Sequence, residues 1–258
     1  MGASRGDGGD RETASADAAR RVVKVLIAVK DLTAAKSRLA AEFSPPDRSR
    51  LVLAMLSDTV SAASAVPVVE SVTVVTPDPL VARTAREIGA RVFDEPVGDP
   101  ARHPDERLNH AFASAAHVLR RDAAVGDIQD GLTRTADRVD IIALQADLPS
   151  MRSTELAQAY AAARSGGRSL VVDHHGTGTA ALILKDSPDD LAPLFGRDSA
   201  RHHSASGARE LDGSWPGLRL DVDTADDVRR AHRLGVGPAT SAVLRSLGWS
   251  EEASATTA

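Results

Sequence analysis

Three aspartates stand out for their position and spacing. Asp147 follows the apolar run I-I-A-L-Q-A, and ligands of parallel α/β sheets collect at the carboxyl ends of strands. Asp221 and Asp223 lie two residues apart in L-R-L-D-V-D-T, so an extended backbone turns both side chains to one face. Magnesium prefers clustered carboxylate oxygens and usually bridges them to substrate phosphates. We therefore expect Asp147, Asp221 and Asp223 to bind magnesium, and we expect Asp147 to be catalytic.

Three cations lie in the segment K-D-L-T-A-A-K-S-R-L, directly after the first apolar run. Lys36 and Arg38 are suited to bind a polyphosphate and a leaving pyrophosphate, since arginine offers a planar fork of donors. The pattern G-x-x-x-x-G-K-[ST] is absent, which disfavours a Walker-type ATPase. We therefore predict a nucleotide-binding segment with Lys30, Lys36 and Arg38, of which Lys36 and Arg38 are catalytic.

Two further segments carry groups that suit an anion. The run G-T-G-T at 176–179 lies between two apolar runs, so its amides and hydroxyls are placed to line an anion pocket. The run F-G-R-D-S-A-R-H-H at 195–203 has the pattern of a loop that enters a short helix. Free amides near Ser199 would then hold phosphate or carboxylate. The two segments predict a second anion-binding region.

Each of these motifs also has an explanation that needs no ligand. Asp223 and Thr224 would begin a helix whose capping box is Thr224 and Asp227. Cations after a strand often only face solvent, and glycine-threonine runs often form plain hairpin turns. Adjacent histidines are expected to point in divergent directions and no H-E-x-x-H spacing is present, so the paired histidines are not expected to bind a metal. These are His174, His175, His202 and His203.

Short apolar runs alternate with helical patterns, which predicts a mostly parallel α/β sheet flanked by helices. One helix is expected after the cap Ser44, with Pro45 in its first turn and an apolar stripe facing the sheet. Two more are expected over 79–89 and 108–120, and 121–138 has the pattern of a polar surface excursion. The runs expected as strands are 22–29, 71–76, 91–93, 139–144, 170–173, 180–184 and 218–221.

Composition narrows the class of protein. The chain has 258 residues, 42% hydrophobic and 26% charged, which predicts one domain over 21–248 with tails at 1–20 and 249–258. Without cysteine there is no disulfide, zinc-thiolate site or thiol nucleophile. No run of 18 apolar residues and no signal-peptide core is present, so we expect no membrane association and a cytoplasmic location. A net charge of −5 and 3% aromatics disfavour nucleic acid as a partner.

Five motifs in order resemble one family. They are A-V-K-x-L-x-x-A-K-S-R-L, Q-A-D-L-P, G-T-G-T-A, F-G-x-D-S-A-R-H and W-P-G-L-R-L-D-V-D-T. From about residue 22 to residue 237 the chain is similar to the phosphoenolpyruvate or 2-phospho-L-lactate guanylyltransferases of coenzyme F-420 biosynthesis, known as FbiD and CofC. The actinobacterial FbiD branch is the most similar.

The resemblance implies a single-domain nucleotidyltransferase with a glycosyltransferase-A-like, Rossmann-like fold. It implies that GTP and phosphoenolpyruvate react to give enolpyruvyl-diphospho-5'-guanosine and pyrophosphate, with two magnesium ions on the same three aspartates. The family's phosphoenolpyruvate contacts fall on Thr179, Gly196 and Ser199. Lys36 and Arg38 would face the phosphates of GTP. Nucleotide base and ribose contacts are expected at strand and helix ends, on Thr76, Asp78, Leu108 and Asn109.

Several points stay open at this level. The residues do not decide between phosphoenolpyruvate and 2-phospho-L-lactate as acceptor, and transient coupling to the downstream transferase is an open possibility. Ala146 stands where many relatives have glycine, which would constrain the backbone beside Asp147 if that position requires positive φ. The alternatives are another nucleotidyltransferase of this fold, acting on a molybdenum cofactor precursor or a sugar phosphate, and a non-catalytic nucleotide-binding protein. Retention of all three aspartates disfavours the last.

Overall fold

The computed structural model describes most of the chain, including every helix and strand discussed below. The expected tail 1–20, nearly all of the expected tail 249–258, and Lys30 lie outside the described residues. The ranges described are 21–29, 32, 36–94, 103–129 and 139–249.

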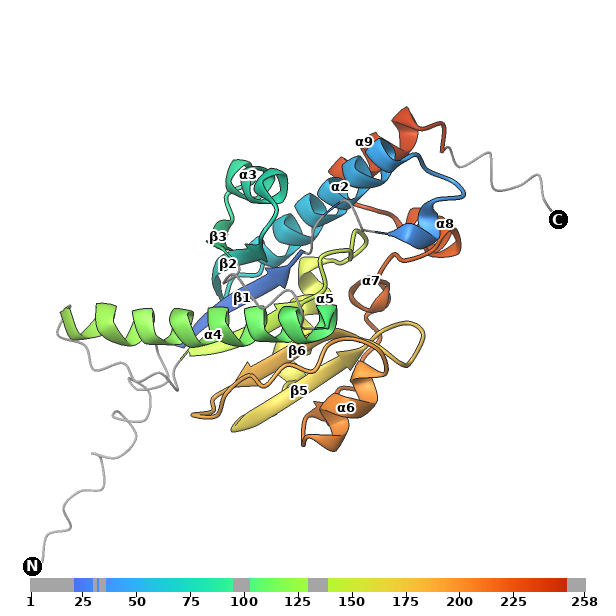
Figure 1. The fold of residues 1–258 in the computed structure, drawn as a ribbon. Helices are drawn as coiled ribbons and strands as arrows, with labels where there is room; N and C mark the ends of the chain where they lie inside the picture. Colours follow the sequence, from blue (N-terminus) through green and yellow to red (C-terminus); the bar gives the residue numbers. More distant parts are fainter. Residues whose placement is uncertain (1–20, 30–31, 33–35, 95–102, 130–138, 250–258) are drawn as a thin grey trace, which may run out of the picture.

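A seven-stranded mixed sheet forms the centre of the described part of the chain (Figure 1). Its strands follow in space the order β3-β2-β1-β4-β6-β5-β7. Neighbouring strands are parallel except that β6 runs antiparallel to both β4 and β5. The strands are β1 Val22–Ala28, β2 Val69–Thr76, β3 Arg91–Asp94, β4 Val139–Leu144, β5 Gly167–Val172, β6 Thr179–Lys185 and β7 Arg209–Glu210.

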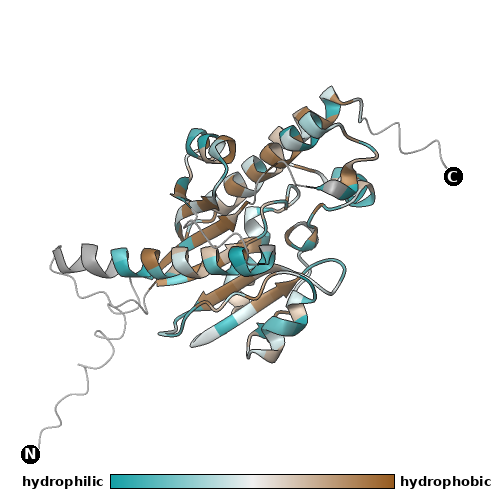
Figure 2. Ribbon diagram, viewed as in Figure 1, coloured by the Kyte–Doolittle hydropathy of each residue, from teal (hydrophilic) through white to brown (hydrophobic). Residues whose placement is uncertain are grey.

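Helices cover both faces of the sheet, because the strand residues alternate between two apolar clusters (Figures 1 and 2). Val25 and Ile27 of β1 face α2, whereas Leu26 between them faces α4. Helices α2, α3, α5, α8 and α9 pack on the first side, and α4 and α6 on the second. The helices are η3 Ser37–Leu39, α2 Pro45–Ser64, α3 Pro79–Glu87, α4 Pro104–Gln129, α5 Ser153–Ala162, α6 Ser199–Ala205, α7 Pro216–Arg219, α8 Ala225–Leu234 and α9 Pro238–Ser246.

The first expected helix is confirmed. Ser44 caps α2 through its side-chain oxygen, Pro45 is the first helical residue, and the apolar stripe that includes Met55 and Val60 is buried against the sheet. The capping box of Thr224 and Asp227 at the start of α8 is also confirmed. Both helices therefore begin where side-chain oxygens satisfy backbone N–H groups that lack a helical partner.

Three expectations about local structure are wrong. The run 218–221 is no strand: Trp215 and Pro216 begin the single turn α7, and Leu218 is buried by this turn instead of by strand pairing. The third helix is longer than expected, since α4 continues to Gln129 through half of the predicted excursion; the other half, 130–138, lies outside the described residues. Trp249, assigned to the tail, stacks on Phe43 with ring centroids 5.3 Å apart.

None of the described helices combines the length and the apolar character needed to cross a membrane. That finding covers only the part of the chain that the structure describes.

One buried carboxylate joins α2 to α9, and its removal tests the packing of these helices. Asp58 accepts hydrogen bonds from the backbone N–H groups of Ala239 (3.0 Å) and Thr240 (2.8 Å). We expect Asp58→Ala to lower the free energy of unfolding by about 1–3 kcal/mol, because it leaves two helix N–H groups without an acceptor. Asp58→Asn retains one acceptor oxygen and should cost less. Urea unfolding followed by circular dichroism measures both; an Asp58→Ala midpoint equal to that of the exposed control Asp190→Ala would contradict this role.

Candidate active site

A cavity of about 850 Å³ opens at one edge of the sheet, a volume typical of small-ligand sites. The carboxyl ends of β1, β4 and β5 meet at this edge. Because β6 runs antiparallel, its first residue, Thr179, lies at the same edge and pairs with Val172 at the end of β5. The cavity thus collects residues that follow three strands and the residue that begins a fourth.

The three predicted aspartates all line this cavity. Asp147 comes directly after β4, and its backbone carbonyl accepts a hydrogen bond from the N–H of Val222 (3.1 Å). That bond fixes the segment that carries Asp221 and Asp223 beside Asp147. Ala146 is not among the described residues with positive φ, so alanine fits there without backbone strain.

Lys36 lies between two of these carboxylates. Its Nζ donates to Oδ2 of Asp147 and to Oδ1 of Asp223, the latter at 2.6 Å. Burial disfavours the ammonium charge, but the two carboxylates outweigh it and raise the pKa of Lys36 above its usual range. Lys36 therefore carries a full positive charge at neutral pH and compensates part of the negative charge of the cavity.

The single positive charge of Lys36 does not neutralise all the aspartates of the cavity. Burial, and then the charges of Asp147, Asp173 and Asp223, raise the pKa of Asp221 to about 7. Oδ1 of Asp147 is buried and has no hydrogen-bond partner among the described residues. A buried carboxylate oxygen without a partner and a carboxyl group that is hard to ionise both fit a site for a hard divalent cation. Asp147, Asp221 and Asp223 therefore suit Mg²⁺ in their chemistry.

Thr179 of β6 belongs to the cavity lining, and a buried histidine orients its hydroxyl. Nε2 of His203 accepts from the N–H of Leu194 (2.8 Å), so Nδ1 carries the proton of the neutral ring and donates it to Oγ1 of Thr179 (2.9 Å). Burial, and then the charge of Arg168, lower the pKa of His203 to about 4, which keeps the ring neutral. The ring therefore acts as a donor to the hydroxyl of Thr179 and does not take up its proton.

The loop before α6 supplies Gly196 and Ser199 to the cavity wall. The side chain of Asn109 holds this loop through two hydrogen bonds with the backbone of Phe195 (2.9 and 2.8 Å). Gly196 has φ of 129° and lies so close to Asp105 that a Cβ atom would come within 2.6 Å of its carboxylate. Only glycine fits this position, which explains its occurrence in the motif.

The remaining predicted nucleotide contacts divide into two groups. Arg38 and Leu108 line the cavity with Lys36. Thr76 and Asp78 do not line it: Thr76 is buried, and Asp78 caps α3 through the N–H groups of Leu80 and Val81. Asn109 also lies outside the lining, behind the loop that it holds.

The run 176–179 forms the hairpin turn that was expected as its plain explanation, and its predicted anion binding stays a prediction. It belongs to the hairpin between β5 and β6, with Gly176 at φ of 78°, and Thr177, Gly178 and Thr179 also line the cavity.

The two pairs of adjacent histidines differ in how their side chains are oriented. His202 is exposed while its neighbour His203 is buried, as expected of divergent side chains. His174 and His175 do not diverge: their ring centroids are 3.8 Å apart, so that expectation is wrong for this pair.

Sequence reasoning missed the roles of two residues: Asp173, which lines the cavity, and His203, which contacts Thr179 of the lining. Asp173 follows β5 as Asp147 follows β4, so the same end-of-strand signal applies to it; its Oδ1 accepts from the N–H of Thr177 (3.0 Å). His203 lies four residues after Ser199, which places both on one side of the helix. The spacing indicates a shared face, but nothing local predicts that the ring would reach Thr179.

The family model described as "Guanylyl transferase CofC like" matches residues 23–258. A relative from Rhodococcus opacus (strain B4), named phosphoenolpyruvate guanylyltransferase, is 54% identical over 229 residues, which cover 86% of this chain and 90% of the relative. A relative of the same name from Mycolicibacterium smegmatis is 50% identical over 220 residues, 85% of this chain and 89% of the relative. The predicted resemblance is thereby confirmed.

Solved structures share the fold at low sequence identity. A protein from Desulfovibrio desulfuricans G20, described as a nucleotide-diphospho-sugar transferase, aligns with a TM-score of 0.57 and 14% identity, covering 87% of this chain and 94% of that one. A nucleotidyl transferase from Methanothermobacter aligns with a TM-score of 0.52 and 15% identity, covering 87% and 99%. The predicted fold class, a glycosyltransferase-A-like nucleotidyltransferase fold with a mostly parallel sheet, is confirmed.

His203 is expected to make stability depend on pH below neutrality. Its pKa is about 4 in the folded chain against an ordinary 6.5, so between these values the unfolded chain binds a proton that the folded chain does not. This contribution to stability is complete above about pH 6.5 and is lost as the pH falls through about 4. The free energy of urea unfolding should fall less steeply over this range in His203→Gln than in the wild type. Equal slopes would contradict a neutral, buried His203, and His202→Gln is the exposed control.

Proposed function

We propose that this chain, which belongs to the family of CofC-like guanylyl transferases, transfers GMP from GTP to phosphoenolpyruvate in coenzyme F-420 biosynthesis. The products are enolpyruvyl-diphospho-5'-guanosine and pyrophosphate. The name of relatives that are 54% and 50% identical supports this acceptor. The observation that carries the proposal is the aspartate cluster with Lys36 in a cavity of nucleotide-binding size.

The chemistry fits a site without a catalytic base. A phosphate oxygen of the acceptor attacks the α-phosphorus of GTP, the bond from that phosphorus to the bridging oxygen of the β-phosphate breaks, and pyrophosphate leaves. Because the attacking phosphate is already anionic near neutral pH, positioning and charge neutralisation suffice. Mg²⁺ held by the three aspartates would supply charge neutralisation and a template for the phosphates.

The residues of the chain divide the positioning between donor and acceptor. Lys36 and Arg38 bind the phosphates of GTP and receive the charge of the leaving pyrophosphate. On the other side of the cavity, the hydroxyls of Thr179 and Ser199 donate to the acceptor, and the backbone at Gly196 lets it approach closely. Further contacts with the nucleotide are still predicted for Lys30, Thr76, Asp78, Leu108 and Asn109. Asn109 would act through the loop that it holds. A cytoplasmic location and transient coupling to the downstream transferase belong to this proposal.

The direct test supplies purified protein with GTP, Mg²⁺ and either phosphoenolpyruvate or 2-phospho-L-lactate. The downstream transferase and its deazaflavin acceptor are included, and mass spectrometry identifies the product. We expect the dehydro product from phosphoenolpyruvate. Product only from 2-phospho-L-lactate would change the acceptor, and no product from either, with an active partner enzyme, would overturn the guanylyltransferase assignment.

Asp147→Asn tests the carboxylate cluster. The amide keeps the size of the side chain and removes its charge, so the fold should persist. Turnover should fall by more than about 100-fold, because losing even a hydrogen-bond partner of a metal ligand typically costs about 10–100-fold. The steady-state rate at saturating substrates measures the loss. Asp190→Asn, an exposed residue outside the cavity lining, is the matched control and should keep the wild-type rate.

Lys36→Met separates charge compensation from catalysis. In the unliganded chain the ammonium binds the same carboxylates as the proposed Mg²⁺, so its removal should strengthen Mg²⁺ binding in the absence of nucleotide. Turnover should nevertheless fall, because the GTP phosphates lose a cation. Isothermal titration with Mg²⁺ measures the first effect and the product assay the second. Weaker Mg²⁺ binding in Lys36→Met would refute this competition.

A further inference from the structure

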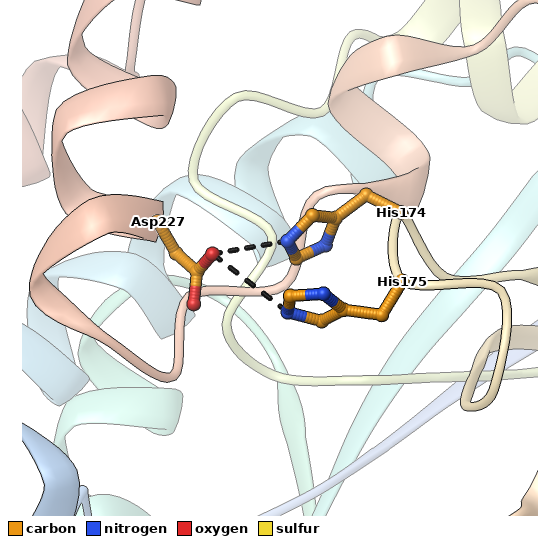
Figure 3. A group of neighbouring side chains, drawn as sticks. All are labelled: His174, His175 and Asp227. Carbon is orange, nitrogen blue, oxygen red and sulfur yellow. Dashed lines mark hydrogen bonds and ion pairs between the residues drawn. The ribbon is translucent and has the colours of Figure 1, made fainter.

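Two adjacent histidines direct their rings to a single carboxylate oxygen, outside the residues assigned above (Figure 3). Nε2 of His174 lies 3.0 Å from Oδ1 of Asp227, and Nε2 of His175 lies 3.9 Å from the same oxygen. All three atoms lie within 4.8 Å of one another. The two rings are tilted by 40° with centroids 3.8 Å apart, so neighbouring side chains turn toward the same carboxylate.

The hydrogen bonds around Asp227 leave its Oδ1 to the histidines. Its other oxygen, Oδ2, accepts from the backbone N–H groups of Asp223 (3.2 Å) and Thr224 (2.8 Å) and from the hydroxyl of Thr224 (2.8 Å). The capping box therefore uses one oxygen and fixes the orientation of the carboxylate. Oδ1 is held in place, with only 2% of the side chain exposed.

The second nitrogen of His174 has the partner that metal-binding histidines usually have. Nδ1 lies 3.2 Å from Oδ1 of Asp221, so a proton on Nδ1 is shared with that carboxylate. Both ring nitrogens are therefore held by carboxylates, and an ion that replaces a proton on Nε2 would meet Oδ1 of Asp227 beside a fixed ring. A carboxylate behind the histidine is the common outer partner of a ligating imidazole.

The spacing and access suit one small cation. Zinc bonds of about 2.1 Å to nitrogen and oxygen put neighbouring ligand atoms of a tetrahedron about 3.4 Å apart, between the two observed separations. His174 is mostly buried, whereas the side chain of His175 is 54% exposed and lines the main cavity, which gives an entry path.

We propose that His174, His175 and Asp227 bind one divalent transition-metal ion such as Zn²⁺, in a site separate from the magnesium carboxylates. Two imidazoles and one carboxylate select a borderline-soft ion, whereas Mg²⁺ prefers an all-oxygen shell. The bond from His174 to Asp221 joins this site to the carboxylate cluster, so its occupancy fixes one side of the catalytic cavity.

Metal binding to the whole protein tests the proposal without reference to turnover. The full chain is titrated calorimetrically with Zn²⁺ in the presence of saturating Mg²⁺, and separately with Co²⁺, whose visible absorption distinguishes a four-coordinate protein site from the hydrated ion. We expect one Zn²⁺ per chain, not displaced by Mg²⁺. The result is independent of the proposed guanylyl transfer, since an inactive chain with an intact site would still bind.

Variants at the exposed ligand avoid a failure to fold. His175→Ala removes a half-exposed ring and should weaken Zn²⁺ binding by more than about tenfold, the least effect expected when even an outer partner is lost. His174→Gln should do the same, while His202→Ala, an exposed histidine of α6, should bind as the wild type does.

Three results would overturn the proposal. They are no Zn²⁺ binding by the wild type, binding that excess Mg²⁺ abolishes, and binding that His175→Ala leaves unchanged. The first would mean that His174 only forms hydrogen bonds with Asp221 and Asp227 and that His175 only packs against it. The second would place the ion on the magnesium carboxylates.

Discussion

The rest of the structure depends on bringing four carboxylates to one edge of a sheet. The same cavity is lined by Asp147, Asp173, Asp221 and Asp223. Their negative charges repel one another strongly because water is partly excluded from the cavity. Two features reduce this repulsion. The Lys36 ammonium lies between two of the carboxylates, and the raised pKa of Asp221 favours its neutral form. Backbone hydrogen bonds around the cluster hold the aspartates in place. A bound cation would neutralise the negative charge that Lys36 leaves uncompensated.

Those backbone bonds come from segments that are far apart in the chain. Val222 is hydrogen-bonded to the carbonyl of Asp147, and the N–H of His174 donates to the carbonyl of Arg219 (2.7 Å). The guanidinium of Arg219 in turn binds the carbonyl oxygen of Val172 (2.8 Å), the last residue of β5. The irregular segment after α7 is thus joined to the residues that end or follow two strands, β4 and β5. Its fixed position brings Asp221 and Asp223 to the lining of the cavity.

The sequence predicted what is set by local pattern. Apolar runs located the six principal strands, and the caps at Ser44 and Thr224 located two helix starts, because these signals act over a few residues. Asp147 was found because ligands collect at the carboxyl ends of parallel strands. Asp221 and Asp223 were found because residues two apart share one face of an extended backbone. The run 218–221 has the alternation of a strand, and only its surroundings show that Pro216 begins a helical turn there. Lys36 pairs with Asp147, 111 positions away in the sequence, and with Asp223, 187 positions away. A local sequence pattern cannot predict contacts between residues so far apart in the chain.

The two sides of the cavity use different kinds of donor, and the difference follows from their surroundings. On the carboxylate side, Lys36 keeps its charge because two anions stabilise it against burial. On the side of β6 and α6, His203 is enclosed by Phe195 and the backbone, so burial favours its neutral ring and the ring orients Thr179 through one directed bond. Charged groups attract any anion, whereas a fixed hydroxyl selects for the position of an acceptor oxygen. A transferase that must bind a triphosphate and align a second, smaller phosphate needs both: charge where the donor carries most charge, and neutral, rigid donors where alignment decides the reaction.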